Sequence, residues 1–367
     1  MIRNLALICL MVFVLAGCGG SKPANVLQPD ETGRLTIYST TDTEIFRPVI
    51  ADFNTLYPRV VINYVELDSA PLNDRVLDEH RRNTVQSDIV FSTAMDMQVK
   101  LVNDGLAARH VSANADNLPD WAQWRHEAFG LTFEPVVMLY NPRLLGSRRV
   151  PQSRADLAHM LAADPQFWQG RIGTYDIGQS SVGYLLATQD ARQSSEFGAL
   201  GKVMGSRGVR TYAKTSELIA DIETGRIAFG YNVLGSYAKR RIAAGGNLKI
   251  IYPQDYTLAI VRTAVIPKRA PNPRSAHTFL EYLISIRGQN ILARNSFLSA
   301  ARSELGGAYG RIGITGSDIG PLRPIPLGPG LMTYLDRQKK DRFIANWQAM
   351  TGSGERPPLL QPDQAKN

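Results

Sequence analysis

The amino-acid sequence predicts an α/β protein of two lobes. Short apolar and β-branched runs alternate with stretches whose apolar residues recur at helical spacing, which is typical of parallel βαβ units. The alternation occurs in two blocks, and the second begins near Pro151. Hydrophobic residues make up 44% of the chain and charged residues 20%, which is enough apolar material for two cores.

The first block contains three predicted strands separated by helices. The strands span residues 35–38, 60–65 and 88–91, and the helices span 44–56, 73–82 and a stretch through 99–102. Ile45, Val49 and Phe53 recur at helical spacing, and Pro58 ends that helix. Gly105 ends the third helix.

The second block continues the alternation and then returns to the first. Its predicted strands span 133–140, 227–231, 249–252 and 258–266, and its helices span 182–187, 216–223, 276–286 and 334–349. Because the late strands lead back to the first block, we predict lobe 1 from residues 34–135 plus 262–305 and lobe 2 from 136–261. Residues 306–350 form a C-terminal extension with a helix, and 351–367 form a disordered tail.

The chain starts with the pattern of a secretory signal. Arg3 precedes an apolar run over residues 5–16, which is too short to span a bilayer. The sequence Leu15-Ala16-Gly17-Cys18 then resembles the lipobox of bacterial lipoproteins, in which the Cys is acylated and becomes the first mature residue. The alternative is an ordinary signal peptide with a chance Cys.

We therefore predict a signal peptide over 1–17, lipidation at Cys18 and a flexible lipidated tether over 18–33. The protein is expected in the periplasm, anchored to a membrane. Positions 19 and 20 are glycines and lack the Asp that commonly signals inner-membrane retention. The anchor is therefore assigned to neither the inner nor the outer membrane. Cys9 lies in the signal, so the mature chain has no spare thiol for a disulfide or a Cys-based site.

The charge distribution and the absence of known catalytic motifs reduce the number of function classes that fit the sequence. The formal net charge of +8 is spread along the chain, which argues for no nucleic-acid partner in an exported protein and only weakly favours anionic ligands. No Walker loop, zinc motif, nucleophile elbow or dinucleotide fingerprint is present, and the five histidines lack ligand spacing. We expect no catalytic residue, no cofactor, no metal site and a monomer.

Several motifs occur in the order of a known family. Residues 35–42 (LTIYSTTD), 53–58 and 87–92 (SDIVFS) resemble the opening of the ferric-ion class of bacterial ABC-transporter solute-binding proteins. Further stretches resemble later motifs of the same family and occur in the same order; they are residues 137–142, 168–173, 225–230, 264–267 and 282–293. The resemblance implies a periplasmic-binding-protein-like fold, in which two α/β lobes joined by crossing hinge strands close on a ligand in the cleft between them.

The family's iron ligands are missing at the corresponding positions. Asp42 stands where the resemblance places a metal-binding His, and Thr93 stands where it places a Glu. An adjacent tyrosine pair is expected near Leu234-Gly235, yet no Tyr-Tyr dipeptide occurs in the chain. Because Fe³⁺ needs several hard anionic oxygens, we do not expect iron as the ligand. Residues 231–238 instead resemble a branch associated with small organic anions.

Polar residues at strand ends and helix starts are the predicted ligand-binding site, because ligands and anions bind there in open α/β sheets. They are Ser39, Thr40, Thr41, Asp42, Ser92, Thr93, Gln179, Ser180, Ser181, Tyr231, Asn232, Tyr237 and Asp255. The alternative role is a plain N-cap for the hydroxyl residues and Asp42, and core packing for the tyrosines. The Asp255 carboxylate either recognises an ammonium group of the ligand or caps a turn.

These observations predict a solute-binding lipoprotein of an ABC importer. It captures a small anionic metabolite (a phosphate ester, phosphonate or carboxylate) by lobe closure and delivers it to an inner-membrane permease. Two alternatives stay open: a ligand-sensing partner of a membrane histidine kinase, and ferric-ion binding as in the wider family. An enzyme is not predicted.

Overall fold

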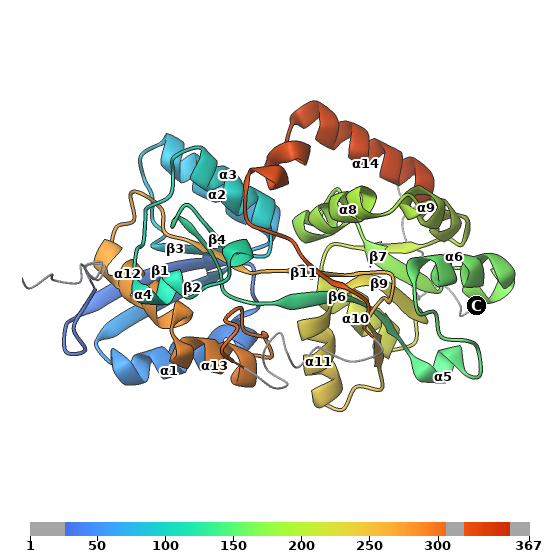
Figure 1. Ribbon diagram of the computed structural model, residues 1–367, viewed down its shortest axis with the longest axis horizontal. Coiled ribbons are helices and arrows are strands. Elements are labelled where there is room, and N and C mark those ends of the chain that lie inside the picture. Colours follow the sequence, from blue (N-terminus) through green and yellow to red (C-terminus); the bar gives the residue numbers. More distant parts are fainter. Residues whose placement is uncertain (1–25, 306–318, 353–367) are drawn as a thin grey trace, which may run out of the picture.

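A computed structural model describes residues 26–305 and 319–352 and contains two α/β lobes placed side by side (Figure 1). One sheet has six strands and the other has seven, and helices pack on both. The predicted fold class is therefore confirmed. The signal peptide, Cys18 and most of the tail lie outside the described residues. Within the described ranges, no helix is long and apolar enough to cross a membrane.

The first lobe is built on the sheet β2-β1-β3-β12-β5-β4, in which β1 runs parallel to β2 and β3. Its strands are β1 (Gly33–Ser39), β2 (Val60–Glu66), β3 (Ile89–Ser92), β4 (Gln123–Trp124), β5 (Ala128–Gly130) and β12 (Thr263–Val265). Its helices are α1 (Thr43–Leu56), α2 (Ser69–Arg81), α3 (Met95–Asn103), α4 (Ala113–Asp116), η1 (Asp120–Ala122), α12 (Pro273–Ile284) and α13 (Ile286–Asn295). Phe46, Phe53 and Phe279 are fully buried and form the aromatic centre of its core.

The second lobe is built on the sheet β13-β11-β6-β9-β7-β8, with β10 also paired to β6. Its strands are β6 (Glu134–Tyr140), β7 (Ile172–Tyr175), β8 (Arg210–Tyr212), β9 (Phe229–Leu234), β10 (Lys249–Ile251), β11 (Thr257–Ile260) and β13 (Leu322–Pro324). Its helices are α5 (Pro142–Leu145), α6 (Arg154–Ala163), α7 (Pro165–Trp168), α8 (Ser181–Gln193), α9 (Phe197–Ser206), α10 (Thr215–Glu223), α11 (Gly235–Ala243), η4 (Pro329–Tyr334) and α14 (Arg337–Thr351).

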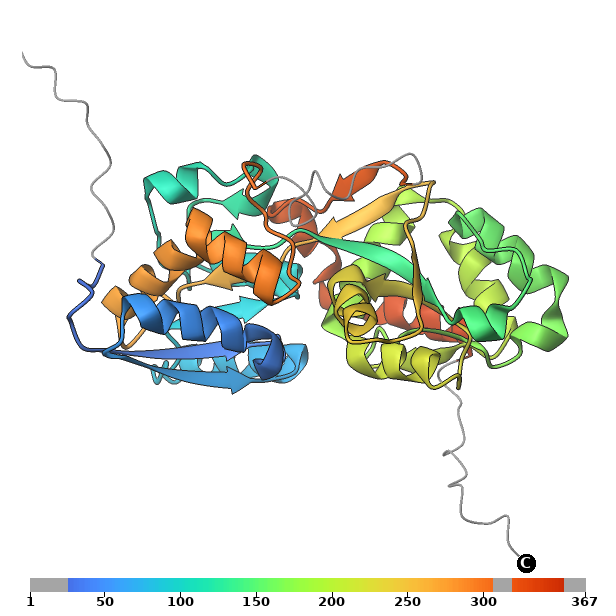
Figure 2. The ribbon, with the colours of Figure 1, turned by 90° about the horizontal axis from the view of Figure 1, so that it is seen from below.

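Two neighbouring segments of the chain cross between the lobes (Figure 2). The prediction of one strand over 258–266 is wrong, because its two halves belong to different sheets. Ala259 in β11 pairs with Pro135 of the second lobe, whereas Thr263 in β12 pairs with Ser92 of the first. Between them, the Arg262 backbone N–H donates to Thr132 Oγ1 at 2.8 Å. The crossing segments are therefore bonded to each other where the sheets change.

Two local predictions also differ from the structure. The helix predicted over 73–82 begins earlier, at Ser69, because a proline is tolerated in the first turn, where Pro71 lies. The end of the predicted tether is not free: Leu27 is only 5% exposed, and its N–H donates to Thr278 Oγ1 at 2.7 Å. Residues just before β1 are therefore packed on the first lobe.

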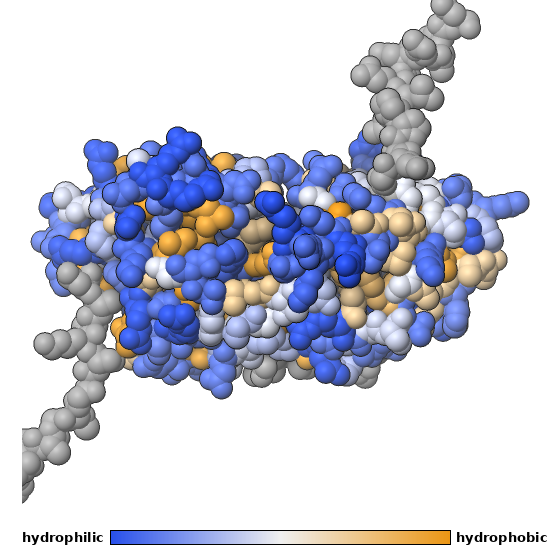
Figure 3. Space-filling view, turned by 90° about the horizontal axis from the view of Figure 1, so that it is seen from above, coloured by the Kyte–Doolittle hydropathy of each residue, from blue (hydrophilic) through white to orange (hydrophobic). Residues whose placement is uncertain are grey.

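The described part of the C-terminal extension contacts both lobes. β13 pairs in parallel with β11, η4 packs against α3 of the first lobe, and α14 packs against α9 of the second. The helix predicted over 334–349 corresponds to α14, which begins after Asp336, whose carboxylate accepts from the Lys339 N–H. The face seen from above is mostly hydrophilic, with hydrophobic residues in patches between (Figure 3).

Close packing of α9 on α14 depends on Gly205. A Cβ at this position would lie 1.9 Å from the Met350 carbonyl oxygen. We expect Gly205→Ala to force α14 away and to lower the free energy of unfolding by about 1–3 kcal/mol, the usual cost of overpacking. Urea unfolding followed by tryptophan fluorescence measures this, because Trp347 of α14 stacks on Phe197.

Gly198, on the same helix, is the matched control. Nothing lies within 4 Å of a Cβ built there, so Gly198→Ala should leave stability equal or raise it by up to ~1 kcal/mol through helix propensity. Equal stability of the two variants would contradict the assigned packing of α14.

Candidate functional site

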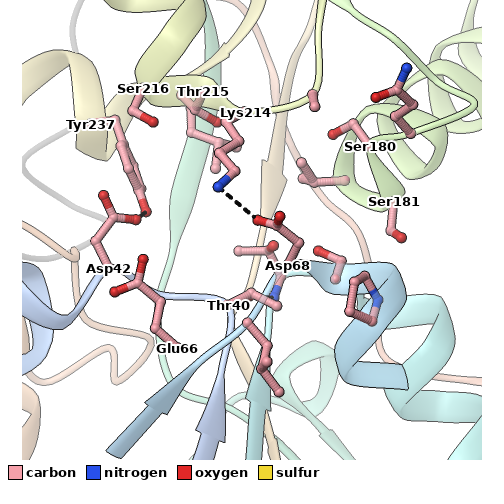
Figure 4. Close-up of a pocket in the computed structure, with 18 of the residues that line it drawn as sticks. Thr40, Asp42, Glu66, Asp68, Ser180, Ser181, Lys214, Thr215, Ser216 and Tyr237 are labelled. Carbon is pink, nitrogen blue, oxygen red and sulfur yellow. Dashed lines mark hydrogen bonds and ion pairs between the residues drawn. The ribbon is translucent and has the colours of Figure 1, made fainter. Parts of the chain in front are cut away.

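A cavity of about 280 Å³ lies between the lobes, where strands end and helices begin (Figure 4). Both lobes contribute polar side chains to it. Its lining residues include Thr40, Asp42, Glu66, Asp68, Ser69 and Thr93 from the first lobe, and Gln179, Ser180, Ser181, Lys214, Thr215, Ser216 and Tyr237 from the second. Of the predicted site residues, it therefore brings together Thr40, Asp42, Thr93, Gln179, Ser180, Ser181 and Tyr237.

The first lobe lines the cavity with three carboxylates, and each has a partner. Asp42 Oδ1 accepts from the Tyr237 hydroxyl at 2.7 Å. Glu66 Oε2 accepts from the backbone N–H and the hydroxyl of Thr43, both at 2.8 Å, and so caps the start of α1. Asp68 Oδ1 lies 3.1 Å from Lys214 Nζ. The negative charge on this wall is partly offset in every case.

The second lobe presents the N-termini of α8 and α10 to the same cavity. Ser180 caps α8, since its hydroxyl accepts from the Gly183 N–H at 3.2 Å, and Ser181 is the first helical residue. The Ser181 hydroxyl has no hydrogen-bond partner among the described residues. Lys214 occupies the N-cap of α10 without a side-chain cap bond, and the first N–H groups of α10 have no partner among the residues that the structure describes. This wall attracts anions.

Two contacts join the lobes across the cavity. Tyr237 of α11 reaches Asp42 at the start of α1, and Lys214 reaches Asp68 at the start of α2. Burial is the main cause that raises the pKa of the Tyr237 hydroxyl, so the phenol stays protonated and donates. The hydrogen bond to Asp68 raises the pKa of Lys214, which keeps the ammonium charged.

A buried ion pair lies at the crossing segments, and its arginine, Arg262, also lines the cavity. Arg262 is 1% exposed, and its Nε donates to Glu134 Oε1 at 2.7 Å. Arg262 Nη1 also donates to Thr41 Oγ1 at 2.7 Å, and the Ser236 hydroxyl donates to Glu134 Oε2. Burial penalises the guanidinium, yet the neighbouring Glu134 carboxylate and Tyr237 raise the pKa of Arg262 overall, so it remains charged.

Three predicted ligand contacts in the first lobe turn inward. Ser39 Oγ accepts from the Thr41 N–H at 3.0 Å, and Ser92 Oγ accepts from the Ala94 N–H at 3.1 Å. The Thr41 hydroxyl accepts a hydrogen bond from Arg262 Nη1. Ser39, Thr41 and Ser92 are buried and do not line the cavity, because the two serine hydroxyls accept from backbone N–H groups and the Thr41 hydroxyl accepts from Arg262.

The prediction that Tyr231 and Asn232 face the cleft is wrong. Tyr231 is 1% exposed, its hydroxyl donates to Asp190 at 2.7 Å, and Asn232 donates to the same carboxylate. Arg154 joins this buried cluster by bonds to Asp190 and Asp255. Asp255 therefore balances a buried guanidinium and does not line the cavity.

Several lining residues were missed at the sequence level. Glu66 directly follows the strand predicted over 60–65, Asp68 lies three residues after its end, and Lys214 lies two residues before the helix predicted over 216–223. The rule that found Thr40 and Ser180 would have found these three. Arg262 lies inside a predicted strand and gives no such signal. Within 26–305 and 319–352, no group of three His, Cys, Asp or Glu side chains is placed to hold a metal ion.

The fold and the cleft define an extracytoplasmic solute-binding protein. Residues 86–306 match the family model of bacterial extracellular solute-binding proteins, and the chain belongs to that family. A substrate-binding protein of an ABC transporter from Agrobacterium tumefaciens is 35% identical, with a TM-score of 0.82, over 88% of this chain and 95% of that chain. Together these matches make this chain a solute-binding protein of the ABC-transporter type.

Two more distant relatives are known by different solutes, one from the sugar phosphate in its structure and one from its name. The periplasmic protein AfuA of Actinobacillus pleuropneumoniae, solved with fructose-6-phosphate, is 17% identical with a TM-score of 0.72, over 88% of this chain and 99% of its own. At that identity the likeness shows the fold alone. Iron uptake protein A1 of Synechocystis sp. is 23% identical over 308 residues, which are 77% of this chain and 80% of that protein.

Removing one partner of the buried pair tests its place in the fold. Arg262→Met leaves Glu134 buried and uncompensated, so we expect the free energy of unfolding to fall by about 3–5 kcal/mol. Arg47→Met breaks an ion pair with Glu44 in which both side chains are more than half exposed, and should cost less than ~1 kcal/mol. Denaturant unfolding of both variants decides, and a similarly small loss in each would place the pair outside the stabilising core.

Proposed function

We propose that the protein captures a small anionic solute, namely a phosphate ester, a phosphonate or a carboxylate, and delivers it to an ABC permease. The observation that carries the proposal is the second lobe's wall, where α8 and α10 both begin at the cavity. Their N–H groups, the Ser181 hydroxyl and the Lys214 ammonium together suit an anion. The sugar phosphate bound to AfuA supports this choice of ligand class.

The opposite wall adds a second requirement to the solute. Asp42, Glu66 and Asp68 would repel an anion, but they accept hydrogen bonds well. We therefore propose that the anionic group faces the second lobe and that hydroxyl or ammonium groups face the first. An Fe³⁺ cargo fits less well, since the three carboxylates already serve Tyr237, Thr43 and Lys214.

Lobe closure follows from this division of the site. Each lobe supplies one half of the recognition, so a solute gains all its contacts only when both halves meet. A ligand shifts the lobes toward the closed form only by the difference in its affinity for the two forms. The contacts Tyr237–Asp42 and Lys214–Asp68 belong to that closed arrangement in our proposal.

The first test separates binding from stability at the start of α8. Ser181→Ala removes a hydroxyl that has no described partner, so it should weaken solute binding about tenfold with little change in stability. Ser180→Ala removes the N-cap and should lower the free energy of unfolding by about 1 kcal/mol. Calorimetric titration with phosphate esters, phosphonates, carboxylates and ferric citrate provides the affinities.

Tight ferric binding without anion binding would contradict the proposal. Unchanged affinity in Ser181→Ala would move the anion away from α8. Mass spectrometry of solute released from the purified, denatured protein identifies the natural ligand independently of the chosen panel.

We also propose that Cys18 anchors the protein to a membrane through a lipid. The motif Leu15-Ala16-Gly17-Cys18 supports the proposal. In the native host, Cys18→Ser should move the protein from the membrane fraction to the soluble periplasmic fraction and abolish labelling by a palmitate analogue. Labelling that persists in Cys18→Ser would assign the lipid to another residue.

A further inference from the structure

A second cavity, of about 310 Å³, adjoins the solute cleft. The two cavities share three lining residues, Asp42, Ser216 and Tyr237. The hydrogen bond between Tyr237 and Asp42 thus stands as a partition between them. In Figure 4, Tyr237, Asp42 and Ser216 lie on one side of the first cavity, and all three also line the second.

The walls of the second cavity differ from those of the first. Ile219 and Ala220 of α10 and Ala244 after α11 give it an apolar surface, in contrast to the hydroxyls and carboxylates of the cleft. An apolar surface next to a polar cleft suits a hydrocarbon portion of a solute whose polar group lies in the cleft.

Two arginines complete the second cavity, and they differ in their partners. Arg241 is paired with Glu223. Arg240, one turn beyond Tyr237 on α11, is partly buried, and its guanidinium has no hydrogen bond or ion pair with any described residue. A half-buried guanidinium without a carboxylate partner favours an acidic group brought by a ligand.

We propose that the second cavity is a subsite of the solute cleft, which takes an apolar chain that ends in an acidic group held by Arg240. The solute then carries an acidic group at each end, one at the α8 and α10 N-termini and one at Arg240. This inference rests on the proposed function of the cleft. Tyr237 lies between the two subsites and packs against the chain of the solute.

Three phosphonates separate the parts of the site by calorimetric titration. Methylphosphonate occupies only the cleft, hexylphosphonate adds the apolar chain, and 6-phosphonohexanoate adds a terminal carboxylate. We expect hexylphosphonate to bind about tenfold more tightly than methylphosphonate, because methylene groups are buried. We expect 6-phosphonohexanoate to bind about tenfold more tightly again, because a charge-assisted bond forms with Arg240.

Variants assign the two gains to their residues. Arg240→Gln should bring the affinity ratio of 6-phosphonohexanoate to hexylphosphonate down to about one. Arg192→Gln, an equal charge change on an exposed residue at the end of α8, should keep the ratio at about ten. Ala220→Leu fills the apolar wall with a good helix former and should abolish the gain of hexylphosphonate over methylphosphonate.

The outcomes distinguish the subsite from the cleft. Equal binding of all three phosphonates leaves the anion site at α8 and α10 intact and overturns the subsite. Equal ratios in Arg240→Gln and Arg192→Gln overturn the role of Arg240. Failure of every phosphonate to bind contradicts the proposed function, and the subsite falls with it.

Discussion

The ion pair between Arg262 and Glu134 determines how the two lobes meet. Glu134 begins β6 where the chain enters the second lobe, and Arg262 lies where the chain returns to the first. Taking both charges out of water is costly unless their remaining donors and acceptors are satisfied. They are satisfied from both lobes, since Thr41 accepts from Arg262 and Ser236 donates to Glu134. The loops on both sides of the cleft are thereby fixed to one buried point.

The cleft above this pair has opposite electrostatic character on its two walls. Helix N-termini and Lys214 face it from the second lobe, and Asp42, Glu66 and Asp68 face it from the first. Lys214 and Tyr237 each bond to a carboxylate of the opposite lobe. A solute that turns an acidic group toward the second lobe and hydrogen-bond donors toward the first can contact both walls at once. The walls therefore select the orientation of the solute as well as its charge.

Local patterns predicted the parts of this site that depend on one segment of chain. The serines at 180–181 and Thr40 follow strands and precede helices, and their positions in the cavity need only that local geometry. Tyr231 fits the same pattern, yet its side chain is buried because its hydroxyl donates to Asp190 and accepts from Arg154. Asp190 lies 36 residues from Arg154 along the chain, and no local pattern reveals that pairing. The position of Arg262 at the cavity was not predicted for a similar reason, because the segment that passes from one sheet to the other looks like one continuous strand in the sequence.

The C-terminal extension gives the hinge a third connection that the crossing strands alone do not provide. One hydrophobic cluster contains Met95 and Val99 of α3, Leu185 of α8, and Leu327 and Leu331 of the extension, so it joins both lobes. The Tyr184 hydroxyl of α8 also donates to the Tyr334 carbonyl at 2.6 Å. Separating α3 from α8 would expose the buried apolar side chains of this cluster to water, which is unfavourable. The extension therefore joins the two lobes at α3 and α8, in addition to the crossing segments.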